Sequence, residues 1–417
     1  MAGIAILFED EGTRNLHPLT LNRPVYDLRC GVRLLHEKAR AAYPQAEFGY
    51  QSREVLCALV KQQKGVGKVN GGFGDRGLLL NGRVLWNAKL AKAIPLEGED
   101  RIYSCGNVMV AARLSGKSFA SIDWSKPIHA SAFQGIPAGN VEADIISYPW
   151  DLIHHNPAQI KADTEALGCN GAKDGKVYEG VHLLAAERIT IAAGASVKPG
   201  VVIDAEGGPV LIDEGAKIFP QAVIEGPCYI GKNSAIKIAA KIYEGTSIGE
   251  ICKVGGEVEE SIIHSYSNKQ HEGFLGHAYL GMWVNLGADT NNSDLKNDYG
   301  TVRCMINGEE VDSGSQFVGA TIGDHSKAGI NTMFNTGTIV GICCNIFGSN
   351  FPPKYIPSFS WGGADAMMEY RFDKCMQVAR RVMQRRKMEL TDVEESVLRW
   401  VYDDTASERK GSFASSK

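Results

Sequence analysis

The sequence predicts a chain of two parts, an α/β domain followed by a parallel β-solenoid that ends in helices. Three observations support this fold class. An apolar residue recurs every six positions in the second half, strand-like and helix-like segments alternate over residues 1 to about 150, and the 47 glycines indicate many tight turns. A length of 417 residues fits two or three domains.

Composition excludes several classes of protein. The chain has 44 basic and 48 acidic side chains, so no positive surplus favours binding to nucleic acid. The apolar run 4–8 is short and is followed by acidic residues, and no later run reaches the ~18 apolar residues that a membrane span needs. The ten cysteines form no CxxC pair and fit reduced thiols. We therefore expect a cytoplasmic protein without a nucleic-acid or membrane partner.

The first part alternates strands with helices. Short apolar runs and amphipathic stretches predict strands at 4–8, 46–50 and 78–80 and helices at 31–42 and 52–62, with a glycine-rich turn at 65–77. Alternation of this kind is typical of an α/β layer, which is Rossmann-like in its general build.

The second part shows an unbroken period of six. Branched aliphatic residues recur at Ile212, Ile218, Ile224, Ile230, Ile236, Ile242, Ile248 and Val254, and most are followed four residues later by a small side chain. A helix has a period of 3.6 and a plain strand a period of 2, so neither explains this pattern. Three strands and three corners in 18 residues would close one coil, with the aliphatic residues inside, and stacked coils would form a solenoid.

The period is interrupted once and then resumes in phase. Leu286 and Ile322 lie six hexads apart, and polar residues occupy the positions between them. We expect segment 289–316 to leave the solenoid as a loop of the kind that often carries function.

These features predict the domain boundaries. We assign 1–165 to the α/β domain, 166–180 to a connector and 181–356 to the solenoid. Residues 357–403 are expected to form terminal helices, one of them starting at a capping box of Thr391 and Glu394, and 404–417 a disordered tail.

The loop after the first strand contains Gly12-Thr13-Arg14, followed by Pro18-Leu19-Thr20. A glycine turn with a nearby guanidinium suits phosphate groups. This loop resembles the signature of sugar-1-phosphate nucleotidyltransferases. The resemblance implies a nucleoside triphosphate and a sugar 1-phosphate as substrates, Mg²⁺ as cofactor, and nucleotide contacts at Gly12, Thr13 and Arg14.

Two positions depart from that family. Val25 stands where the family has a lysine on the sugar phosphate, and we expect Arg23 and Arg29 to substitute for it. Arg83 stands where the family has an aspartate that holds the metal, so no metal ligands are assigned.

The solenoid carries a second resemblance. Its hexads resemble the left-handed parallel β-helix of hexapeptide-repeat acyltransferases. The stretches Gly276-His277-Ala-Tyr279-Leu-Gly281, Val284-Asn285-Leu-Gly and Asn297-Asp-Tyr-Gly300 resemble the bifunctional N-acetylglucosamine-1-phosphate uridyltransferase and glucosamine-1-phosphate acetyltransferase. The whole chain resembles the shortened bacterial form of that enzyme.

This second resemblance implies an acetyltransferase site with acetyl-CoA as the acetyl donor, and it implies that the protein is a homotrimer. His277 would be the base, Tyr279 and Asn285 would contact substrate or acyl group, and Asn297 would contact the sugar. Where the family has two cations on the sugar phosphate, this sequence reads Lys241-Ile-Tyr243-Glu-Gly and Glu259-Glu260. Both cationic contacts are missing, and Lys253 and Lys269 are the candidates to compensate.

Other readings stay open at this point. The chain could keep only one of the two transferase activities, or it could be a non-catalytic sugar-nucleotide sensor. His264, His271 and His277 also allow a zinc site like that of hexapeptide-repeat carbonic anhydrases.

Overall fold

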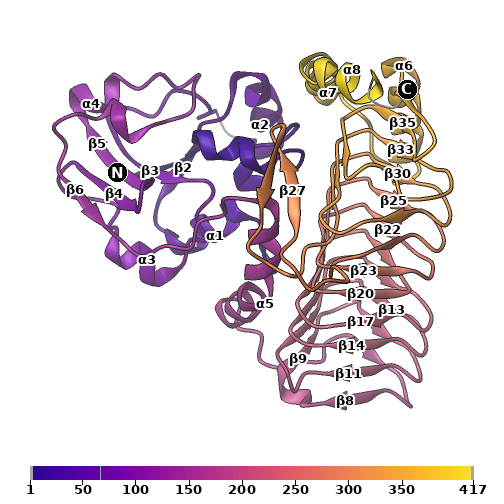
Figure 1. Ribbon diagram of the computed structural model, residues 1–417. Helices are drawn as coiled ribbons and strands as arrows, with labels where there is room; N and C mark the ends of the chain where they lie inside the picture. Colours follow the sequence, from indigo (N-terminus) through magenta and orange to yellow (C-terminus); the bar gives the residue numbers. More distant parts are fainter. Residues whose placement is uncertain (1–2, 66, 415–417) are drawn as a thin grey trace. The chain divides into compact units, whose positions relative to one another are not determined.

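The computed structural model describes residues 3–65 and 67–414, which divide into two compact units (Figure 1). The first unit takes in the described residues of 1–28, 33–148 and 391–400, and the second those of 29–32, 149–390 and 401–417. The boundary differs from the predicted one at 165. Helix α5 (Pro149–Ala166) belongs to the second unit, where Asn156 donates to the carbonyl of Gly245 at 2.6 Å and accepts from the Ser247 hydroxyl at 3.1 Å.

The first unit is a mixed six-stranded sheet in the order β2-β1-β3-β5-β4-β6. Its strands are β1 (Ile4–Phe8), β2 (Glu47–Tyr50), β3 (Arg76–Asn81), β4 (Arg101–Cys105), β5 (Val108–Ser115) and β6 (Ala138–Asn140). Its helices are α1 (Leu35–Ala42), α2 (Cys57–Lys64), α3 (Ala88–Ala93) and α4 (Gly116–Ala120). The predicted α/β layer is confirmed, and β1, β2 and β3 run parallel.

Alternation along the central strands builds a core on both faces of this sheet. Ala5 and Leu7 pack with one buried cluster, whereas Ile6 and Phe8 pack with the other. Because β1, β2 and β3 are parallel, their carboxyl ends meet at one edge, which is where open α/β sheets bind ligands.

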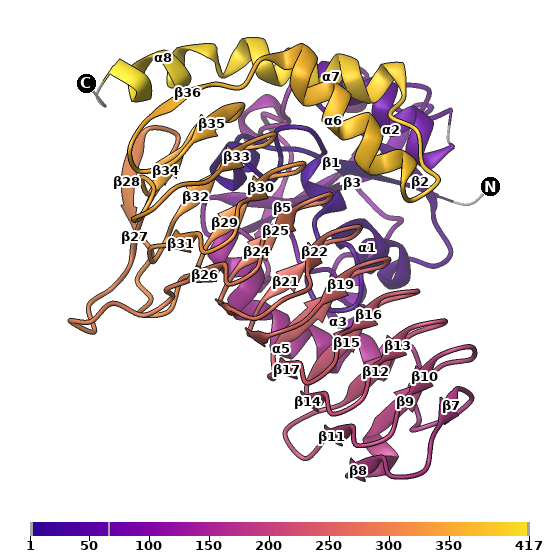
Figure 2. The ribbon, with the colours of Figure 1, turned by 90° about the vertical axis from the view of Figure 1, so that its right-hand side faces the viewer.

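The second unit is a three-faced parallel β-helix whose coils wind in the left-handed sense (Figures 1 and 2). Face I contains β7 (Lys176–Val177), β10 (Ser196–Val197), β13 (Lys217–Ile218), β16 (Ala235–Ile236), β19 (Lys253–Val254), β22 (Asn268–Lys269), β25 (Asn285–Leu286), β30 (Lys327–Ala328), β33 (Asn345–Ile346), β35 (Ser360–Gly362) and the antiparallel β36 (Met367–Glu369). Face II contains β8 (His182–Leu184), β11 (Val202–Asp204), β14 (Val223–Glu225), β17 (Lys241–Ile242), β20 (Glu257–Glu259) and β23 (Phe274–Gly276). Face III contains β9 (Ile189–Ile191), β12 (Val210–Ile212), β15 (Cys228–Ile230), β18 (Thr246–Ile248), β21 (Ile262–Ile263), β24 (Tyr279–Leu280), β29 (Thr321–Ile322), β32 (Ile339–Val340) and β34 (Tyr355–Ile356).

The predicted hexads line the interior of this helix. All eight aliphatic residues of the longest run are buried in one core cluster. The small residues that follow them are buried as well, and the Ser234 hydroxyl donates to the carbonyl of Gly249 on the next coil at 2.7 Å. Corners fall in the left-handed backbone region at Gln221, Asn233 and His277, among others, with φ of 64°, 56° and 44°.

The predicted loop excursion is confirmed. β24 pairs with β29 and β25 with β30, so the coils on either side of the excursion stack directly. The excursion follows β26 (Asn291–Asn292), which pairs with β31 (Met333–Phe334). It contains an antiparallel hairpin of β27 (Arg303–Ile306) and β28 (Glu309–Asp312).

The chain ends in helices α6 (Phe372–Gln384), α7 (Asp392–Asp404) and α8 (Ala406–Ala414). The capping box forms as predicted, because the Glu394 amide donates to the Thr391 hydroxyl at 3.2 Å and the Thr391 amide donates to the Glu394 carboxylate at 2.8 Å. Disorder from 404 onward was the wrong expectation for 406–414, where α8 forms, and 415–417 lie outside the described residues. Within the described chain, no helix combines the length and apolar content needed to cross a membrane.

Candidate functional site

The predicted phosphate loop lies at the carboxyl end of β1. Gly12, Thr13 and Arg14 form part of a 3₁₀ turn, η1 (Glu11–Leu16). This turn lies at the sheet edge where the parallel strands end, which is the edge that binds ligands in open α/β sheets. Thr13 is buried and its carbonyl accepts a bond from the Thr20 hydroxyl at 3.0 Å, whereas Arg14 is exposed. The structure therefore brings the three residues together on one turn.

The two arginines expected to replace the family lysine belong to different units. Arg23 is buried in the first unit, and its carbonyl accepts from Arg53 at 2.9 Å. Arg29 belongs to the second unit, where its guanidinium donates to the Val32 carbonyl and lies 5.6 Å from the ring centre of Tyr229. Arg29 is thus held by contacts within the second unit, and its role at the nucleotide site stays a prediction.

Two of the three acids next to this turn, Glu9 and Asp10, are paired with arginines and do not fit a magnesium site. Asp10 forms a two-point ion pair with Arg83, at 2.7 Å to Nε and 2.6 Å to Nη2. Glu9 is paired with Arg53 at 3.1 Å. Among the described residues, no group of three or more His, Cys, Asp or Glu side chains is placed to hold a metal ion, which also removes support from the zinc alternative.

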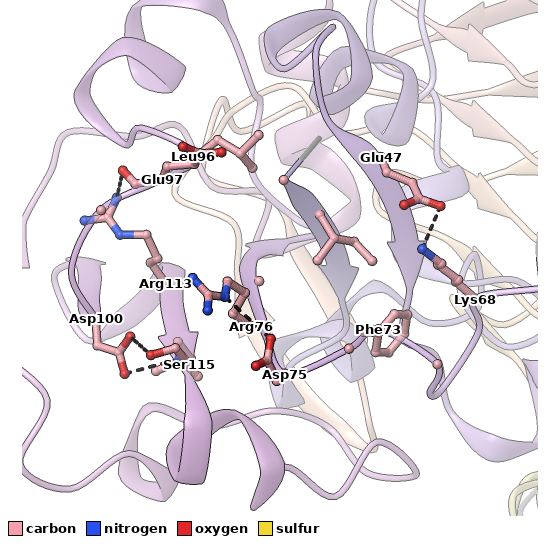
Figure 3. A pocket seen from close by; sticks show the side chains of 17 residues that line it. Glu47, Lys68, Phe73, Asp75, Arg76, Leu96, Glu97, Asp100, Arg113 and Ser115 are labelled. Carbon is pink, nitrogen blue, oxygen red and sulfur yellow. Dashed lines mark hydrogen bonds and ion pairs between the residues drawn. The ribbon is translucent and has the colours of Figure 1, made fainter. Parts of the chain in front are cut away.

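A cleft of about 1030 Å³ opens at the opposite edge of the first unit's sheet, beside the amino ends of β1, β2 and β3 (Figure 3). Several of its charged groups already have partners. Lys68 contacts Glu47 at 2.7 Å, Asp100 accepts from the Ser115 hydroxyl at 2.8 Å, and Arg113 donates to backbone carbonyls. Because these groups already have partners and the cleft lies at the amino ends of the strands instead of their carboxyl ends, it lacks the features of a phosphate site.

His277 lies at a corner between face II and face III and is flanked by two carboxylates. Its Nδ1 is 2.9 Å from Asp294, and its Nε2 is 3.2 Å from Glu260. Asp294 stands at the start of the excursion, and Glu260 occupies a neighbouring corner. Burial of the imidazole opposes its charge, but the hydrogen bonds that its ring nitrogens donate to both carboxylates prevail and raise the pKa of His277 to about 9.

The excursion also covers this histidine. The ring of Phe317 stacks on the imidazole with centres 5.1 Å apart, and the Phe317 carbonyl is 3.2 Å from Nε2 of His154 on α5. His277 is only 7% exposed as a result. Asn297, the predicted sugar contact, lies further along the excursion and is exposed.

Lys253 and Asn285, two of the predicted sugar and acyl contacts, lie on a different face from the His277 corner. Lys253 and Asn285 belong to the outer surface of face I, on either side of Asn268 in the strand register. Asn268 donates to Asn285 at 3.3 Å and accepts from Arg386 at 2.8 Å. Burial and the neighbouring Arg386 lower the pKa of Lys253. Within one chain, Lys253 and Asn285 therefore do not form a single site with His277.

Two predicted contacts, Lys269 and Tyr279, are buried in the second unit and bonded within it. Lys269 takes an inward position of the coil and donates to the carbonyls of Gly255 at 3.0 Å and His271 at 2.8 Å. Burial lowers the pKa of its ammonium to about 8. Tyr279 is fully buried on face III, and its hydroxyl accepts from the Arg29 amide at 2.9 Å.

The place of Tyr279 leads to a testable prediction. Tyr279→Phe leaves the buried Arg29 amide without its acceptor, so we expect a loss of about 1–3 kcal/mol in the free energy of unfolding. Denaturant unfolding of the full chain measures this, with Tyr299→Phe as a control because Tyr299 is 66% exposed. An unchanged stability together with weaker substrate binding would restore the ligand role.

Sequence reasoning missed Asp294, Glu260 and Phe317 as neighbours of His277. The predicted excursion, 289–316, contains Asp294 but ends one residue before Phe317, and the sequence gives no sign of the contacts that either makes with His277. Glu260 lies in the Glu259-Glu260 pair, which sequence comparison identifies only as the place of a missing cation.

Comparisons with known proteins agree with the two-part reading. Residues 5–170 match the family model described as "Sugar nucleotidyl transferase". The bifunctional sugar-1-phosphate nucleotidylyltransferase/acetyltransferase of Sulfurisphaera tokodaii is 35% identical over 146 residues, 34% of this chain and 35% of its own length. The bifunctional protein GlmU of Rippkaea orientalis is 30% identical over 142 residues, 29% of this chain and 31% of its own.

The bifunctional protein GlmU of Methanococcus aeolicus is 32% identical over 169 residues, which is 40% of this chain. The chain spans 37% of that protein, so it covers about a third of the length of each of these three relatives. Residues 5–170 therefore carry a domain that matches the sugar nucleotidyl transferase family, in a chain related to bifunctional nucleotidylyltransferase/acetyltransferase proteins.

Proposed function

We propose that the protein makes a nucleotide sugar through two transferase activities. The first unit joins a nucleoside triphosphate, UTP or dTTP, to a sugar 1-phosphate such as N-acetylglucosamine 1-phosphate and releases pyrophosphate. The second unit moves an acetyl group from acetyl-CoA to the amine of an amino sugar phosphate. The match of residues 5–170 supports the first activity, and the carboxylate-flanked His277 supports the second.

The chemistry of acetyl transfer assigns a role to each group around His277. The sugar nitrogen attacks the thioester carbon, the C–N bond forms and the C–S bond breaks. Nε2 of His277 takes the proton from the nitrogen and the departing sulfur receives one, so the thiol leaves. Asp294 at Nδ1 fixes the tautomer and orientation of the ring, and Glu260 at Nε2 must give way to the substrate amine.

A homotrimer would complete this site. Face III is covered by α5 of the same chain, through Asn156, whereas Lys253 and Asn285 remain on face I at the coil levels nearest His277. In a cyclic trimer with parallel axes, face I of one copy lies at the same height as the His277 corner of the next. Lys253, with Arg386 beside it, would then supply cations to the substrate phosphate and the coenzyme.

A split assay on the full chain tests the two activities. Pyrophosphate release is followed with UTP or dTTP and sugar 1-phosphates, and thiol release from acetyl-CoA is followed with glucosamine 1-phosphate. Signal in one arm alone would reduce the function to that activity. If neither pyrophosphate nor thiol is released but the protein still binds a nucleotide sugar, a non-catalytic nucleotide-sugar sensor would be favoured.

The pKa of His277 predicts the pH dependence of acetyl transfer. Only the neutral imidazole accepts a proton, and a raised pKa makes this form scarce below about pH 9. The kcat/KM of acetyl transfer should therefore climb with pH through that value. Glu260→Gln removes one of the charges that hold the proton, so the rise should shift to lower pH, while Glu257→Gln, which has no bond to His277, should leave it in place. Profiles that coincide for the two variants would contradict the role of Glu260.

A further inference from the structure

The carboxyl end of β1 carries three consecutive acids, Glu9, Asp10 and Glu11. The first two are neutralised by arginines of the first unit, whereas the exposed Glu11 contacts His129 at 3.1 Å. The buried Glu9 accepts from the Val25 amide at 3.0 Å, from the Arg53 amide at 3.0 Å and from Arg53 Nε at 3.1 Å. Its oxygens are therefore committed to holding the segment after the phosphate turn. Arg53 also donates to the carbonyls of Thr20 and Arg23, which ties the same segment to the charge pair.

Both oxygens of Asp10 are bonded as well. Besides its two bonds to Arg83, it accepts from the Asn81 side-chain amide at 2.8 Å. Arg83 is 3% exposed, and its third nitrogen, Nη1, donates to the carbonyl of Ile146 at 2.8 Å. The guanidinium thus has protein acceptors on all three nitrogens and is fixed in place.

The guanidinium lies directly against the phosphate turn. A Cβ added to Gly12 would come within 2.4 Å of Cζ of Arg83, so glycine is required there by the arginine. The Asp10–Arg83 ion pair therefore occupies the space beside the turn, at the strand end where the family resemblance leads us to expect a metal-binding carboxylate.

This arrangement opposes binding of a divalent cation. Magnesium at such sites takes one or two carboxylates together with substrate phosphates. Here the oxygens of Glu9 and Asp10 are engaged by arginines, and a cation near Asp10 would be repelled by Arg83 at short range. Freeing Asp10 would leave a buried guanidinium without its partner, which is costly.

We propose that the first unit binds the triphosphate of its nucleotide without a divalent cation, with the fixed guanidinium of Arg83 in the place of the metal. Arg14, exposed on the same turn, supplies the direct charge contact to the phosphates. The inference rests on the proposed nucleotide function of this unit and adds that Mg²⁺ is not part of its ligand.

Titration calorimetry of the full chain with UTP, once in EDTA and once in excess Mg²⁺, tests the proposal. We expect dissociation constants that agree within about threefold. Binding more than about tenfold tighter in Mg²⁺ would overturn the proposal and leave the nucleotide function standing. No binding in either buffer would overturn both.

Two variants test whether Arg83 is the reason that UTP binding does not depend on Mg²⁺. Arg83→Met frees Asp10, so UTP binding should become at least about tenfold tighter in Mg²⁺ than in EDTA. The double variant Asp10→Asn, Arg83→Met removes the freed carboxylate, and the difference between the buffers should vanish again. Arg101→Met, at an exposed arginine of β4, is the matched control. A folded Arg83→Met protein that gains nothing from Mg²⁺ would refute the role of the guanidinium, and the wild-type titration decides the case if that variant does not fold.

Discussion

Replacing His277 by Asn is expected to lower acetyl transfer by about 10²–10⁴-fold, the usual contribution of a general base, while the solenoid remains folded. Asn is chosen because His277 has a φ of 44°, and Asn adopts this left-handed region more readily than most residues. The substitution removes the imidazole between Asp294 and Glu260 without straining the corner. Thiol release from acetyl-CoA measures the rate, and circular dichroism measures the fold.

His325→Asn is a closely matched control. His325 is also a buried corner residue, with a φ of 59° and 7% exposure, and its ring stacks on Trp283. Equal losses in the two variants would show that the corner conformation matters and the base does not. Full activity in His277→Asn would remove the catalytic role altogether.

The solenoid could be predicted in detail because its fold is a local, repeated property of the sequence. Each coil buries its aliphatic residues against the next coil, so Ile212, Ile218 and their successors carry the pattern without any long-range pairing. The same logic predicted the excursion, since Leu286 and Ile322 had to return to the same phase.

The contacts at the candidate sites were less predictable because they join residues far apart in the chain. Arg29 follows the phosphate turn closely in sequence, yet its amide is bonded to Tyr279, 250 residues away. Asp10 and Arg83 come together only because β1 and β3 are parallel neighbours. The resemblance to known families placed Arg83 at the metal position, but only the geometry shows that it takes up the nearest carboxylate.

Gly249→Ala is expected to have the largest effect on stability. Gly249 follows β18, and an added Cβ would come within 1.4 Å of the carbonyl oxygen of His264 on the next coil. Two coils that are bonded here through the Gly249 amide and the Ile263 carbonyl at 2.7 Å would have to separate. We expect the free energy of unfolding to fall by about 3 kcal/mol or more, measured by denaturant unfolding of the full chain.

Gly411→Ala gives the contrasting case in the same unit. Gly411 is exposed in α8 and has no atom within 4 Å of an added Cβ, so the substitution should stabilise its helix by about 0.5–1 kcal/mol. Because each coil contacts only its neighbours, the damage from Gly249→Ala should be local. Hydrogen exchange should accelerate first in β18 and β21, the strands on the two coils that clash, and then toward His277, whose partner Glu260 lies between them. Uniform exchange along the whole solenoid would instead mean that its coils unfold as one unit.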